Sequence, residues 1–287
     1  MMKSVSMPVL ICALLYSFDT FSADSQNDHK FKVVFGTDVS SGNYGHKKET
    51  DILYFPLTFK YKTPAWQYSA TFSYLKITGP GNIVGAGDGS GIPINQFNES
   101  KQPAQRKNTL PGKGKKGKAY SVEGMGDLLL GTIFTFNSQW DMPFYLDGGL
   151  KLKIPTADEE KGLGTGEADL SFNLDIEKTF YSQYLNPFTL FGQLGYKYMG
   201  SSESLPLNNI SFYRLGLDFH LHHKVISGIT YDYRTAMSGS QFSVKELLVY
   251  LDWKIDNNWS INGYAVKGFS DGSPERAYGL QLTHHYH

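Results

Sequence analysis

Charged residues recur at every second position in several segments, which places them on one face of each segment. In 144–154, Asp147, Lys151 and Lys153 alternate with Leu150 and Leu152. If the apolar face meets lipid, the charges point inward, where mixed signs would line an aqueous path. The candidates for this lining are Lys151, Lys153, Asp175, Glu177, Arg214, Asp218, Asp232, Arg234, Glu246, Asp252 and Lys254. Equivalent positions hold Lys60, Asp147, Asp169 and Lys197.

The same alternating charges allow a second interpretation. A salt-bridged and hydrogen-bonded network could fill the interior of a narrow barrel and leave no path. Twelve strands lie between packed eight-stranded barrels and open sixteen-stranded porins, so both interpretations stay open.

A basic segment within 78–120 is the second candidate for function. It has no acidic residue between 101 and 118. A run of like charges usually forms a solvated, mobile loop. Its length also fits a plug or constriction inside a barrel, or a surface that binds lipopolysaccharide phosphates. The basic residues are Lys101, Arg106, Lys107, Lys113, Lys115, Lys116 and Lys118.

Catalytic and metal-binding groupings are not evident in the sequence. The acidic cluster 158–160 has no neighbouring histidine, and period two sends His284 and His285 to opposite faces. No histidine stands with a Ser-Asn-Gly motif, which outer-membrane phospholipases carry. We therefore expect no enzyme activity, no metal site and no cofactor.

Strands must position these residues, because apolar and polar residues alternate from Lys30 onward between Gly, Pro, Asn, Asp and Ser clusters. Aromatic residues make up 15% of the chain, and the formal net charge of zero argues against a nucleic-acid partner. The predicted strands are 30–42, 49–62, 65–77, 121–137, 143–155, 167–180, 186–200, 208–221, 224–236, 241–255, 258–269 and 275–286.

Three features favour a membrane barrel over a soluble sandwich. The segments reach the 9–11 residues that a tilted membrane strand needs. Aromatic residues stand near segment ends, as Trp66, Trp140 and Trp259 do. Short and long connections alternate, as they do between periplasmic turns and external loops. We predict a single antiparallel all-β transmembrane barrel of about twelve strands in the bacterial outer membrane.

The N-terminus predicts export. Lys3 and the apolar run 7–16 resemble a signal peptide, with cleavage after residue 22 or 23. Cys12 is the one cysteine and lies within this run, so the mature chain would have none. The expected organisation is a signal peptide at 1–23 and a barrel at 24–287, with a long external loop at about 78–120.

Three stretches follow one another in a familiar order: GDLLLG at 126–131, GGLKLKIPTAD at 148–158 and GLGTGEAD at 162–169. Their order resembles the outer-membrane barrel family named for a putative meta-pathway of phenol degradation. Ala157 replaces the usual glycine of this family. The resemblance implies a transporter-like barrel and solutes that include small hydrophobic or aromatic ones.

These observations predict a passive channel or transporter for small solutes. The alternative is a closed barrel with a structural, adhesive or lipopolysaccharide-binding role through 78–120. The expected partners are outer-membrane lipid and lipopolysaccharide, a small-molecule solute and the barrel assembly machinery.

Overall fold

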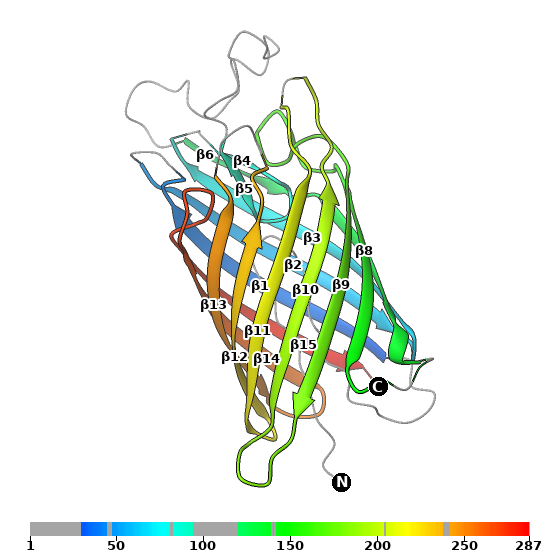
Figure 1. The fold of residues 1–287 in the computed structure, drawn as a ribbon. Coiled ribbons are helices and arrows are strands. Elements are labelled where there is room, and N and C mark those ends of the chain that lie inside the picture. The colour runs from blue at the N-terminus through cyan, green and yellow to red at the C-terminus, as the bar shows by residue number, and fades with distance from the viewer. Residues whose placement is uncertain are drawn as a thin grey trace.

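The computed structural model describes residues 30–44, 48–80, 83–93, 120–138, 140, 142–203, 205–237 and 242–286 (Figure 1). The predicted signal peptide at 1–23 and the basic residues from Lys101 to Lys118 lie outside the described residues. Both therefore stay predictions. Among the described residues, no helix is long and apolar enough to cross a membrane.

The described residues form a closed antiparallel barrel. The sheet runs in the order β2-β1-β15-β14-β13-β12-β11-β10-β9-β8-β7-β3-β6, and a β2–β3 pairing closes it. Among the described wall strands, β6 and β7 both pair with β3, one after the other, and so occupy a single strand position. The described barrel therefore has twelve strand positions. The wall strands are β1 (Lys30–Gly42), β2 (Thr50–Lys62), β3 (Trp66–Gly79), β6 (Tyr120–Met125), β7 (Leu128–Thr135), β8 (Tyr145–Ile154), β9 (Asp169–Phe180), β10 (Phe188–Tyr198), β11 (Ile210–His222), β12 (Val225–Arg234), β13 (Val244–Lys254), β14 (Trp259–Gly268) and β15 (Arg276–Tyr286).

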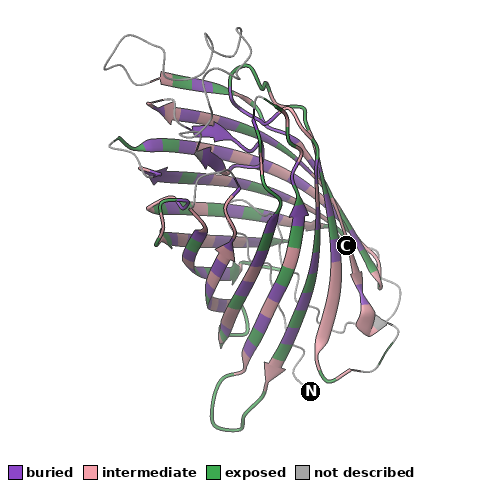
Figure 2. Ribbon diagram, turned by 45° about the horizontal axis from the view of Figure 1, so that its top comes forward, coloured by how far each residue is buried: buried purple, intermediate pink, exposed green. Residues whose placement is uncertain are grey.

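Alternation explains why these segments close into a barrel. The outward residues are apolar and exposed; Leu194 is 65% exposed and Leu215 is 60% exposed. The residues that alternate with them along each strand are buried and largely polar. Figure 2 shows this alternation of exposed and buried positions along the strands. An apolar outer wall suits lipid, and a sheet in lipid must close because its edge groups would find no water.

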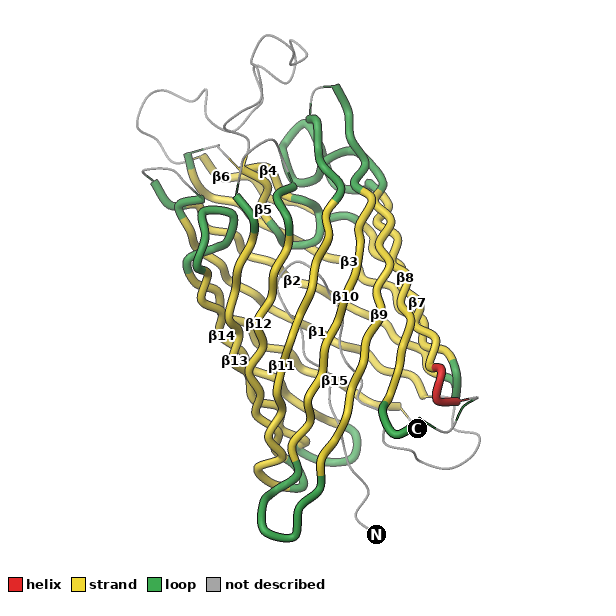
Figure 3. Tube along the Cα trace, viewed as in Figure 1, coloured by secondary structure: helices red, strands yellow, loops and turns green. Residues whose placement is uncertain are grey.

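The two ends of the barrel differ. The end with short connections, such as 223–224 between β11 and β12, is called the turn end below. The other end, called the loop end, carries the longer connections 155–168 and 199–209 (Figure 3). Outer-membrane barrels keep short turns on the periplasmic side and longer loops outside.

The predicted strand 121–137 is interrupted. Gly126 and Asp127 separate β6 from β7, and a 3-10 turn, η2 (Phe136–Ser138), follows β7. The Gly126 N–H donates to Ser73 O of β3 at 2.9 Å, but the Asp127 N–H donates to Gly87 O at 2.9 Å. Asp127 thus bonds to a segment inside the barrel, and the wall breaks where it does so.

The segment predicted as an external loop is partly internal. Within it, β4 (Ile83–Gly85) and β5 (Gly91–Pro93) form a small antiparallel hairpin. Ile83 belongs to a buried cluster with Ile52 and Leu75 of β2 and β3, and Ile92 to another with Ile210 and Val244 of β11 and β13. The hairpin therefore lies within the loop end of the barrel and contacts walls on both sides of it.

Candidate functional site

Two lysines of the barrel wall hold the hairpin. Lys153 Nζ of β8 donates to Ala86 O at 3.1 Å and lies 3.5 Å from an Asp127 carboxylate oxygen and 3.0 Å from an Asp169 carboxylate oxygen. Lys197 Nζ of β10 lies 3.6 Å from Asp88 Oδ2 and 3.0 Å from Asp169 Oδ2. Buried charges need such partners, so these contacts fix the hairpin against β8, β9 and β10.

Asp88 at the hairpin tip is the acidic counterpart of these lysines. Its carboxylate also accepts hydrogen bonds from Ser90, at 3.2 Å from the N–H and 2.5 Å from the hydroxyl. Burial by itself would raise the pKa of Asp88, but the charge of Lys197 and the Ser90 bond outweigh it and lower the pKa to about 2. Asp88 is therefore ionised at neutral pH.

The hairpin turn depends on glycine. Gly87 and Gly89 have φ of +82° and +89°, in the left-handed region that glycine enters without steric cost. A side chain at Gly87 would also collide with the Asp127 carboxylate. Both features let the backbone of the hairpin approach the wall closely.

Two further ion pairs line the loop-end half of the barrel. Arg214 Nε of β11 donates to Asp232 of β12 at 2.8 Å, and Arg234 of β12 donates to Glu246 of β13 at 2.8 Å. These residues are adjacent in the register, since Arg214 pairs with Asp232 and Asp232 with Glu246. All four are buried.

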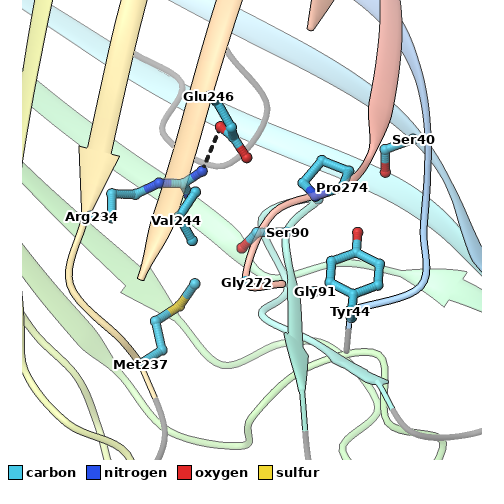
Figure 4. Close-up of a pocket in the computed structure, with 11 residues that line it drawn as sticks. Ser40, Tyr44, Ser90, Gly91, Arg234, Met237, Val244, Glu246, Gly272 and Pro274 are labelled. Carbon is cyan, nitrogen blue, oxygen red and sulfur yellow. Dashed lines mark hydrogen bonds and ion pairs between the residues drawn. The ribbon is translucent and has the colours of Figure 1, made fainter. Parts of the chain in front are cut away.

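A pocket lies beside the hairpin, on the side away from Lys153. Its volume is about 20 Å³, which is room for a water molecule. Ser90 and Gly91 of the hairpin form one side, and Ser40, Arg234 and Glu246 of the wall lie around it (Figure 4). Figure 4 shows the Arg234–Glu246 ion pair near the loop ends of β12 and β13. The hairpin therefore leaves a small pocket on this side.

Among the described residues, the turn-end half of the lumen holds four buried acids, together with the buried Lys60 of β2. Asp175, Glu177, Asp218 and Asp252 all lie toward the turn end of their strands and are buried. Their hydrogen-bond partners are uncharged. Gln193 and Asn173 amides donate to Asp175, the Tyr250 hydroxyl donates to Asp218, and the Asn262 amide donates to Asp252 at 2.7 Å.

Aromatic rings on the inner wall lie over glycines of adjacent strands. Tyr250 pairs with Gly228 and Tyr264 with Gly279, and a Cβ on either glycine would collide with the ring. Each hydroxyl crosses the glycine to reach an aspartate on the next strand, and Tyr264 donates to Asp38 at 2.7 Å. The pairs Phe191–Gly216 and Gly195–Phe212 repeat the arrangement. Glycine thus lets each ring lie along the wall instead of across the lumen.

Nearly all the residues predicted to line the interior are buried. Lys151, Lys153, Arg214, Asp232, Arg234 and Glu246 lie in the loop-end half, and Asp175, Glu177, Asp218 and Asp252 in the turn-end half. Lys254 ends β13 and is only half-buried. Whether they line a continuous path stays a prediction.

Sequence reasoning missed Asp88 and Asp127. Asp88 lies in a segment without strand-length alternation, and its partner Lys197 is more than a hundred residues away. The usable signal was the apolar content of Ile83, Val84 and Ile92 in a segment otherwise rich in glycine. An external loop has no reason to carry such residues.

No protein-family model and no curated protein matches the sequence. Solved structures do resemble the fold. An outer-membrane channel from Pseudomonas putida F1 is 10% identical, with a TM-score of 0.59 over 92% of this chain and 97% of that one. The NanC porin is 7% identical, with a TM-score of 0.51 over 88% and 98%. The KdgM porin is 7% identical, with a TM-score of 0.50 over 89% and 99%.

At these identities the likeness concerns the fold. It confirms the predicted all-β, twelve-stranded outer-membrane barrel, and the apolar outer wall agrees with that location. The specific phenol-degradation family is not confirmed, because no family model matches.

Proposed function

We propose that this barrel is a passive outer-membrane channel for small polar solutes and that the β4–β5 hairpin forms its constriction. The observation that carries the proposal is the position of the hairpin. Lys153 and Lys197 hold it to one wall, while a small pocket lies beside Ser40 and Arg234 on the other. A solute would enter at this pocket and continue toward the acidic turn-end half.

The lining favours polar solutes. Apart from the buried apolar clusters around Ile83 and Ile92, charged and amide side chains dominate the inner wall. Examples are Arg214, Asp232, Asp175 and Gln193. Hydrophobic or aromatic solutes are implied by the family resemblance alone. Passive movement of a solute needs only a pore and a concentration gradient. The proposal therefore includes no cofactor and no catalytic residue.

Single-channel recording tests this function. The mature chain is inserted in a planar bilayer beside a variant in which residues 83–93 are replaced by a short Gly-Ser linker. The expected result is stable conductance steps for the wild type and larger steps for the variant. A Lys161→Gln variant is the control, because Lys161 pairs with Asp158 in an exposed loop. Equal steps in all three proteins would contradict a constriction at the hairpin.

The closed-barrel alternative is supported by the burial of the interior charges, such as Arg214 and Glu246 at 1% exposure each. Under this alternative the wild type folds and inserts but conducts no ions. Lipopolysaccharide binding through Lys101–Lys118 would then be the role to test, with lipopolysaccharide-containing vesicles as the probe.

A further inference from the structure

We infer that the turn-end half of the lumen binds small solutes that carry a protonated amine. This inference rests on the proposed channel and names the class of solute that its inner end selects. Three independent features of the wall support it: acids without cationic partners, amide oxygens without donors, and aromatic rings beside the acids.

The acids form no ion pair with a described residue, and the charge of Arg214 acts on Asp175 only from beyond ion-pair distance. Among the described residues, no lysine, arginine or histidine forms an ion pair with Asp175, Glu177, Asp218 or Asp252. In the loop-end half, by contrast, Asp169 contacts two lysines. Burying a carboxylate is costly unless it is paired, so this cluster is suited to a cation that arrives with the solute.

The amides beside these acids present oxygens that have no hydrogen-bond partner. Gln193 is 2% exposed and Asn173 is 7% exposed; each uses its NH₂ group for Asp175 and leaves its carbonyl oxygen unsatisfied. Asn262 Oδ1 and Asp252 Oδ2 are likewise buried without a partner among the described residues. An amide oxygen only accepts hydrogen bonds, so a solute that pairs with these oxygens must supply a hydrogen-bond donor.

Aromatic rings complete the surface. Phe191 is the cross-strand partner of Glu177, and Tyr250 donates its hydroxyl to Asp218. Each ring lies over a glycine of the adjacent strand and is buried on the inner wall, beside the acid it accompanies. A cation near a ring face is attracted by the ring quadrupole. A protonated amine satisfies all three features, since it supplies positive charge and N–H donors together.

The test measures block of potassium current by n-butylammonium, with n-butanol as the uncharged compound of equal chain length. The expected result is a wild-type channel that prefers K⁺ to Cl⁻ and is blocked by n-butylammonium but not by n-butanol. In the variant Glu177→Gln/Asp218→Asn, the blocking concentration should rise at least tenfold. Asp158→Asn, an exposed carboxylate outside the lumen, should leave it unchanged.

A second readout separates this inference from the channel proposal. Saturation-transfer NMR measures n-butylammonium binding to the refolded barrel without any need for conductance. Binding that depends on Glu177 and Asp218 in a non-conducting barrel would support the site and contradict the channel. A conducting wild type that n-butylammonium neither blocks nor binds, or that behaves like the double variant, would overturn the inference.

Discussion

Charged side chains line both halves of the lumen, but their hydrogen-bond and ion-pair partners differ between the two halves. In the loop-end half Lys153, Lys197, Arg214 and Arg234 each contact a carboxylate, and the hairpin is part of the network. In the turn-end half the acids contact amides and a tyrosine hydroxyl. The first arrangement holds a structure together, whereas the second leaves charge available to a solute.

Breaking the loop-end network should have the largest effect. Lys153→Met removes the shared partner of Asp127, Asp169 and the Ala86 carbonyl, which leaves buried Asp127 without an ion pair and Asp169 with Lys197 alone. Loss of one partner of a buried pair costs about 3–5 kcal/mol. Urea unfolding of the refolded protein in lipid vesicles measures this loss. An unchanged midpoint would show that Lys153 does not support the loop end.

The rings of the turn-end half provide the next test. Gly228→Ala places a methyl group where Tyr250 lies, and such overpacking costs about 1–3 kcal/mol. The displaced ring should also lower conductance. Gly263→Ala on β14 is the matched control, because its added methyl would meet nothing nearer than Leu280 at 3.8 Å. Equal unfolding free energies for the two variants would contradict the packing described.

The pH dependence of stability tests Asp88 in the loop-end half. Its pKa falls from 3.8 to about 2 on folding. The folded state therefore gains stability at pH values above about 4 and loses it as the pH falls toward 2; the gain is about 2 kcal/mol. Wild type and Asp88→Asn should differ in unfolding free energy at pH 6 and converge near pH 2. A gap that stays constant over this range would exclude this role for the Asp88 charge.

Removing a charge from the turn-end half should have the smallest effect. Glu177→Gln leaves no cation without its partner, so the penalty expected for Lys153→Met does not arise. We expect a change below about 1 kcal/mol in the same urea titration. A loss as large as that of Lys153→Met would erase the distinction between the two halves.

The wall could be predicted from the sequence because its signal is local. Leu150 and Lys151 fall on opposite faces by period two alone, and the same rule assigns Leu215 and Arg214. The strand ends were predicted to within a few residues, and the twelve-stranded count followed. Interruption of the wall at Asp127 was not predictable, because the alternation around it does not reveal a bond to Gly87.

For the interior residues, the sequence predicts which face of the sheet each side chain lies on, but not which residue it contacts. Period two turns Lys197 inward, but it does not show that Asp88 lies opposite. It also does not separate paired acids such as Asp232 from unpaired acids such as Asp218, because pairing depends on register between strands. Contacts of this kind depend on the closure of the whole barrel.

Accessibility of a substituted cysteine tests the central claim most directly. The mature chain is expected to lack cysteine, so Asp252→Cys would place one thiol in the turn-end half of the lumen. A charged, membrane-impermeant thiol reagent is added to one side of the bilayer at a time; the current is recorded, and labelling of the thiol is measured by mass spectrometry. A channel predicts modification and reduced current from both sides. Modification from the turn end alone would mean that the hairpin closes the barrel and would contradict the account.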